Sequence, residues 1–202
     1  FLLSADYSKD RPTGVAFNPI VTGAPANALG HVEPAGAFNV NHDTASHEHR
    51  DIYGVSGKLS LDFQNVSFIS ISAFRSLSLD LLDDTDVLSF KLIDFIQDSD
   101  QFQFTQEFRL QNNDDVFQWL IGTYIFHEQS DDRITLDGIS TNLSDVVSDS
   151  YSLFGQFTYN FTKRLGATFG ARYTYEEKDF ETERLGVASY ALTKLDEDWS
   201  AF

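Results

Sequence analysis

The sequence contains no cysteine and no methionine, and only 4 of its 202 residues are proline. Without cysteine, neither a disulfide framework nor a thiolate metal site can form. Long apolar runs are missing as well: no stretch of about 18 apolar residues exists, which excludes a transmembrane helix. A transmembrane strand stays open, because its signal is only about 10 residues of alternating hydrophobicity.

Positive charge is scarce. The chain carries 14 Lys and Arg residues against 31 Asp and Glu residues, which gives a formal net charge of -17 at pH 7. Such a chain repels phosphate backbones, so we expect no nucleic-acid partner. The chain also begins at Phe1 without a charged segment followed by an apolar one. We therefore expect a processed product or a fragment.

Aromatic residues are in excess, with 19 Phe, 8 Tyr and 2 Trp, and this composition favours strands. They recur with a period of two, which is typical of a strand with one apolar face. Residues 53–63 place Tyr53, Val55, Leu59, Leu61 and Phe63 on one side. Residues 66–82 place Ile69, Ile71, Ala73, Leu77, Leu79 and Leu81 opposite serines, with Phe68 and Phe74 interrupting the serine side and Arg75 interrupting the apolar side.

The connections between the predicted strands alternate in length. Long ones are expected near 8–50, 83–100, 128–149 and 179–197, and short ones at 64–65, 112–115 and 162–164. In an up-and-down meander, alternate connections lie at the same end of the sheet. Outer-membrane barrels have this arrangement, with short periplasmic turns and long extracellular loops, and the acidic runs of this chain lie in or beside the long set. The sequence thus predicts an all-β, antiparallel up-and-down transmembrane β-barrel.

The alternation alone is compatible with either a protein core or lipid on the aromatic side, and the order of the loops favours lipid. About eight strands are predicted, and eight are enough to close a small barrel whose side chains fill the interior. The charged residues opposite the aromatic ones favour a larger and wetter barrel; these are Lys58, Arg75, Glu107, Arg109, Arg172 and Lys178.

Two stretches carry a resemblance to a known family. They are "FTQEFRLQNNDDVFQWLIGTYIFHEQ" (104–129) and "SYSLFGQFTYNFTKRLGATFGARYTYEEKDF" (150–180), followed by "DEDWSAF" at the end. From about residue 50 to 202, the chain closely resembles the barrel of TonB-dependent outer-membrane receptors. The resemblance implies a barrel of about 22 strands around a plug, of which this chain holds about eight. Neither a plug domain nor a TonB box is found in the sequence.

The resemblance also implies a function and partners. Such receptors take up a siderophore, cobalamin, haem or glycan-like nutrient across the bacterial cell outer membrane. They use energy delivered by the TonB complex and contact outer-membrane lipid, their own plug domain and a small-molecule ligand. The chain is therefore expected to be a transporter segment and not an enzyme. The alternatives are a self-contained small outer-membrane barrel with an adhesion, structural or hydrolase role, and a soluble acidic β-barrel binding protein.

Few residues stand out as site candidates. The segment 41–51 gathers His42, His47 and His49 with acidic residues, and we interpret it as a solvated polar loop. Glu107 and Arg109 are two apart on one strand face; we expect them to point to the lumen and to form inter-strand ion pairs. We predict no catalytic, cofactor-binding or metal-ligating residue, and the substrate-binding residues are left unassigned.

In the hairpin 151–175 the two faces are predicted separately. On the lipid side we expect Tyr151, Leu153, Phe157, Tyr159, Phe161, Leu165, Ala167, Phe169, Ala171, Tyr173 and Tyr175. On the lumen side we expect Gln156, Thr158, Thr168, Arg172 and Thr174, with Phe154 as an exception.

Overall fold

The computed structural model describes residues 1–14, 39–86, 88–112, 114–186 and 190–201, the last range by its backbone alone. The described residues form one sheet of eight strands in the order of the sequence. The strands are β1 (Leu2–Asp10), β2 (His47–Asp62), β3 (Val66–Asp84), β4 (Asp94–Asn112), β5 (Phe117–Leu136), β6 (Ser140–Thr162), β7 (Leu165–Gly186) and β8 (Tyr190–Ala201). The predicted all-β, up-and-down architecture is confirmed.

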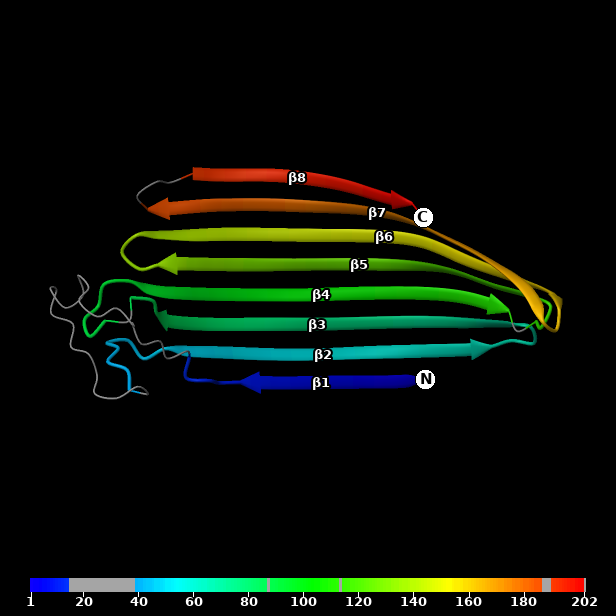
Figure 1. Ribbon diagram of the computed structural model, residues 1–202, viewed down its shortest axis with the longest axis horizontal. Coiled ribbons are helices and arrows are strands. Elements are labelled where there is room, and N and C mark those ends of the chain that lie inside the picture. The colour runs from blue at the N-terminus through cyan, green and yellow to red at the C-terminus, as the bar shows by residue number, and fades with distance from the viewer. Residues whose placement is uncertain (15–38, 87, 113, 187–189, 202) are drawn as a thin grey trace.

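Each strand pairs with the next one antiparallel, and the register runs unbroken over long stretches. One shift occurs among the described pairs, between Asn160 and Thr162 beside the β6–β7 turn. Within the described residues β1 and β8 do not pair with each other, so they form the two edges of an open sheet (Figure 1). The alternative of a small barrel closed by these eight strands is therefore wrong.

Outside this shift, the continuous register assigns each strand residue to one of two faces, because directly opposed residues share a face. We call one side the aromatic face; it carries Tyr7, Tyr53, Phe74, Phe104, Trp119, Phe157 and Phe169. We call the other the polar face; it carries Asp6, Lys58, Arg75, Glu107, Ser152 and Arg172. The predicted division of the hairpin 151–175 into two sides is confirmed: Tyr151 opposes Tyr175 and Phe157 opposes Phe169 on one side, while Phe154 opposes Arg172 on the other.

Strand β3 is oriented differently from what its sequence suggests. Its isoleucine and leucine side lies on the polar face, where Ile71 is opposite both Lys58 and Glu107. Its serine side lies on the aromatic face together with Phe68 and Phe74. There the amide of Gln106 donates to Ser70 Oγ at 3.0 Å and accepts from Ser72, so these polar groups satisfy one another. The uncertain direction of Arg75 is settled as well: it shares a face with Gln103.

The connections differ from those predicted. The ranges 128–149 and 179–197 are mostly strand, since β5 continues to Leu136, β6 begins at Ser140 and β7 continues to Gly186. At the first two predicted loops, β1 continues to Asp10, β2 begins at His47, β3 continues to Asp84 and β4 begins at Asp94. Residues 15–38 and 87 of these predicted loops lie outside the described residues. The end of the sheet opposite the tight turns 63–65, 113–116 and 163–164 still holds the longest connections (Figure 1).

The missed strand segments have a physical explanation. β6 contains 23 residues and extends for roughly 75 Å at about 3.4 Å per residue, although about 9–11 residues suffice for a transmembrane strand. We call the part of the sheet whose aromatic face carries the aromatic side chains the aromatic band. Beyond it both faces are polar, so the period of two disappears from the sequence. Pairing nevertheless continues through the backbone and through cross-strand hydroxyl pairs such as Thr135 with Thr141, 3.1 Å apart.

The sheet is a single layer. Within the described part of the chain, Leu88 is the only buried apolar side chain. Large aromatic and aliphatic side chains are instead exposed along the aromatic face, among them Phe169 at 70% and Leu153 at 57%. The described residues hold no helix of the length and apolarity that a membrane crossing needs. The described residues leave both faces of the sheet uncovered, and the aromatic face presents a long apolar surface.

Candidate functional site

The polar face carries a row of charged side chains along β1 to β4. Arg75 Nη2 lies 3.3 Å from Asp6 Oδ2, and a hollow of about 290 Å³ around this pair is also lined by Gln103 and Thr105. Gly54 lies opposite both Asp6 and Arg75 in the register. A Cβ at this glycine would be 2.7 Å from Asp6 Oδ1, so the absence of a side chain leaves room for the ion pair.

Glu107 and Arg109 lie on the polar face, as predicted. They pair with each other along β4, Nε of the arginine bonding to Oε1 of the glutamate. The predicted inter-strand pairing is therefore replaced by a pair within one strand. Residues two apart on a strand share a face, and long side chains bridge the distance between them. The side chain of Arg109 is 38% exposed and that of Glu107 is 17% exposed, so the pair stays open to a partner molecule on this face.

A second cluster on the polar face surrounds Arg172 of β7. Its guanidinium lies 5.9 Å from the ring centre of Tyr124 and 5.8 Å from that of Phe154, which is the range of a cation–π interaction. The same group donates to Ser152 Oγ at 2.9 Å and to Thr174 Oγ1 at 3.1 Å. The cluster joins β5, β6 and β7 and explains why an aromatic residue occupies position 154 on a polar face.

Gly122 makes room for this cluster. It lies opposite Phe154 in the register. A Cβ at Gly122 would be 2.7 Å from Cε2 of Phe154 and 2.9 Å from the carbonyl oxygen of Phe108, and real Cβ atoms essentially never approach that closely. The Phe154 ring therefore occupies the space that a side chain at position 122 would need.

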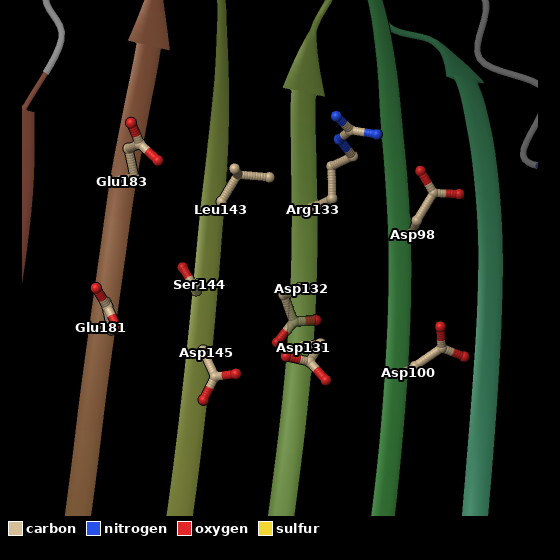
Figure 2. A pocket seen from close by; sticks show the side chains of 10 residues that line it. All are labelled: Asp98, Asp100, Asp131, Asp132, Arg133, Leu143, Ser144, Asp145, Glu181 and Glu183. Carbon is tan, nitrogen blue, oxygen red and sulfur yellow. The ribbon is translucent and has the colours of Figure 1, made fainter.

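An acidic hollow of about 450 Å³ lies further along β4 to β7, in the segments that extend beyond the aromatic band. Asp100, Asp131, Asp145 and Glu181 form one row across the four strands, and Arg133 lies among the carboxylates (Figure 2). Sequence reasoning missed this hollow because it assigned 128–149 to a loop. The available signal was the spacing of two between Asp98 and Asp100 and between Glu181 and Glu183.

Another acidic group organises the β3–β4 connection. Oxygens of Asp43, Asp84 and Asp86 all lie within 4.8 Å of one another. Partial desolvation and the charges of Asp84 and Asp86 raise the pKa of Asp43 above its ordinary value. Asp86 accepts backbone N–H bonds from Leu88 and Ile93, at 2.9 Å and 2.6 Å.

The predicted histidine segment divides into two parts. His47 and His49 are not in a loop but begin β2, and Asp80 on β3 lies directly opposite His49. The three side chains form a group whose candidate ligand atoms lie within 4.8 Å of one another. His42 lies before β2 and is not a member of this group.

The sheet order, the unbroken antiparallel register and the two faces define an all-β protein built like the wall of an up-and-down barrel. A family model described as "TonB dependent receptor-like, beta-barrel" matches residues 3–202. The chain therefore belongs to the TonB-dependent receptor β-barrel family.

Among solved structures, the chain is similar to the ferric yersiniabactin uptake receptor FyuA from Yersinia pestis, with a TM-score of 0.63 at 14% sequence identity. The match covers 78% of this chain and 25% of that receptor, so the chain spans about a quarter of its length. At this identity the likeness shows the fold alone. No curated protein matches the sequence.

Proposed function

We propose that the chain forms part of the barrel wall of a TonB-dependent transporter in the bacterial cell outer membrane. In this proposal the aromatic face contacts lipid and the polar face lines the lumen. The observation that carries the proposal is the register, because it brings aromatic residues of seven consecutive strands to one side of a single-layer sheet. An apolar surface of this extent needs lipid or a large apolar partner.

The end of the sheet with the longer connections is extracellular in this proposal, and the end with the tight turns is periplasmic. The lumen side would then offer the Arg75 and Arg172 clusters to the plug or to a passing ligand. The family membership and the fold likeness to a receptor for ferric yersiniabactin uptake support nutrient uptake as the activity. The cargo is a small nutrient of the siderophore, cobalamin, haem or glycan class. The protein would work with a plug domain and the TonB complex, without catalysing a reaction.

Spin labels on neighbouring residues test the placement in the membrane. The chain has no cysteine, so Phe104→Cys and Gln103→Cys each introduce the only thiol of this segment. The two positions are adjacent on β4 and lie on the aromatic and the polar face. In outer-membrane vesicles, we expect the label at 104 to collide with oxygen, which concentrates in lipid, and to be shielded from a water-soluble nickel complex. A label at 104 that is as accessible to nickel as one on a soluble peptide would contradict the proposal.

The proposed activity has its own test. Cells that carry the full-length receptor are grown with ferric siderophores, cobalamin, haem or oligosaccharides as the limiting nutrient, with and without a functional TonB. Growth or uptake on one nutrient that requires both the receptor and TonB supports the transporter assignment. Equal uptake in the absence of TonB would contradict it, whatever the spin labels show.

A further inference from the structure

We propose that His47, His49 and Asp80 form a binding site for a transition-metal ion, with Zn²⁺ as the probe that matches its ligands. The site lies where β2 and β3 run side by side, just beyond the aromatic band. It is separate from the lumen clusters described above, and the inference holds whatever nutrient the receptor transports. No part of it depends on the placement in a membrane.

The strand geometry brings the three side chains together. His47 and His49 are two apart on β2, so their side chains emerge on the same face. Their rings are stacked, with centres 4.5 Å apart and planes inclined by 29°. In the β2–β3 register, Asp80 lies directly opposite His49, and His47 lies opposite Leu82, the next residue on that face of β3. The carboxylate therefore reaches both imidazoles.

The distances suit a common metal ion. Nε2 of His47 lies 3.2 Å from Oδ1 of Asp80, and Nδ1 of His49 lies 3.5 Å from Oδ2. Zinc bonds to nitrogen and oxygen are about 2.0–2.2 Å long, so the ligand atoms of a tetrahedral site lie about 3.3–3.5 Å apart. The two nitrogen–oxygen distances, 3.2 Å and 3.5 Å, are close to this range. One candidate ligand atom from each of the three side chains lies within 4.8 Å of the other two.

The ligand set selects the class of metal. Two imidazoles and one carboxylate suit zinc, copper, nickel or iron, whereas Ca²⁺ and Mg²⁺ prefer oxygen ligands alone. The surroundings attract a cation, because Asp98 lies opposite Asp80 on β4. Asp51 follows on the same face of β2, but its carboxylate pairs with Arg11. The three side chains are 30%, 42% and 54% exposed, so an ion enters freely and keeps a fourth position open to solvent.

Metal binding would also have a structural consequence. The ion would join the first residues of β2, which begins at His47, to the last residues of β3, which ends at Asp84. An ion bound there stabilises the pairing at the end of the sheet where its longest connections lie. This makes the thermal stability of the protein depend on free metal concentration.

The test is zinc titration of the full-length receptor, purified in detergent and stripped with EDTA. Binding is followed by calorimetry, and Co²⁺ absorption reports the coordination. Removing even an outer-shell partner of a metal site typically weakens affinity about 10- to 100-fold. We expect at least about a tenfold loss in His47→Ala, His49→Ala and Asp80→Asn, and binding retained in Asp80→Glu, which keeps the carboxylate.

His127→Ala is the matched control. His127 also pairs with an aspartate on the same face, its Nδ1 lying 2.8 Å from Asp149 Oδ1, but among the described residues it belongs to no group of three potential metal ligands. This variant should bind zinc like the unsubstituted protein. Unchanged affinity in both His47→Ala and His49→Ala would overturn the proposal, and so would an equal loss in His127→Ala. Asp80→Asn has nearly the shape of the native side chain, and its circular dichroism spectrum shows whether it is folded.

Discussion

At the scale of single residues, Gly122 is a tightly constrained position on the polar face. Substitution by alanine forces the Phe154 ring away, because the new Cβ would lie 2.7 Å from its Cε2 and 2.9 Å from a backbone oxygen that cannot move freely. Overpacking of this kind costs about 1–3 kcal/mol. We expect Gly122→Ala to lower the melting temperature of the purified receptor, measured by circular dichroism.

Gly155→Ala is the control for this substitution. It lies on the neighbouring strand β6, and its new Cβ would meet Leu120 O at 3.4 Å and Ile121 Cγ1 at 3.9 Å, which are ordinary contacts. The melting temperature of this variant should stay close to that of the unsubstituted protein. Equal losses in the two variants would show that any alanine in these strands is harmful and that Phe154 has no special role.

The contacts of Arg172 predict that its substitution is energetically coupled to that of Gly122. Arg172→Lys loses the planar group that lies over Tyr124 and Phe154 and that donates to two hydroxyls, with an expected loss of about 1 kcal/mol. Because Gly122→Ala also acts through Phe154, the double variant should lose less stability than the two single losses together. Urea unfolding of all four proteins measures the coupling, and strict additivity would contradict a shared cluster.

At the scale of elements, one carboxylate accepts two backbone N–H groups at the β4–β5 turn. Asp114 Oδ1 accepts the backbone N–H groups of Phe117 and Val116, at 3.0 Å and 2.7 Å. These bonds lower the pKa of Asp114 below its ordinary value of 3.8. A lowered folded-state pKa means that this stabilisation is present above the unfolded value and is lost as the pH falls through the folded one.

Asp114→Ala should therefore lower the melting temperature at pH 7, and the difference from the unsubstituted protein should shrink below about pH 4. Asp114→Asn keeps an acceptor oxygen and should lose less at pH 7. The neighbouring substitution Asp115→Ala serves as the control in the same turn. A difference between Asp114→Ala and the unsubstituted protein that is the same at pH 7 and pH 3 would contradict a role for the carboxylate charge.

The elements also show where sequence reasoning succeeds. In β6 and β7 the alternation is clean, so the faces of the hairpin 151–175 could be predicted residue by residue. In β3 the isoleucines and leucines suggest one apolar side, yet Phe68 and Phe74 lie on the other, and only pairing with β2 and β4 decides between them. The pairing of Glu107 with Arg109 within one strand could not be predicted from the sequence either, because it depends on the side-chain torsions.

Beyond the aromatic band the sequence has little predictive power for a general reason. Period-two hydrophobicity reports a difference between the solvents on the two faces, and where both faces are polar that difference vanishes. The strands there are held by backbone pairing and by short polar contacts such as Ser144 with Thr182, 3.3 Å apart. For the same reason, the acidic hollow and the position of His47 and His49 on a strand became visible only with the register.

At the scale of the whole molecule, the sheet has two unpaired edges and two uncovered faces. β1 and β8 each leave one side of their backbone without a partner among the described strands, and exposed edges of long strands promote pairing with other chains. Within lipid such edges are excluded, because unpaired N–H and C=O groups cost several kcal/mol each. The remaining strands of a receptor barrel would cover both edges.

The isolated chain 1–202, refolded into detergent, should accordingly associate into oligomers of mixed size, whereas the full-length receptor in the same detergent stays monodisperse. Detergent covers the aromatic face in both samples, so any difference between them comes from the edges and the uncovered polar face. Size-exclusion chromatography with light scattering measures the mass, and circular dichroism confirms that both proteins are rich in β-structure. A folded, monodisperse monomer of the isolated chain would show that β1 and β8 find a partner within these 202 residues, and the open sheet would then be wrong.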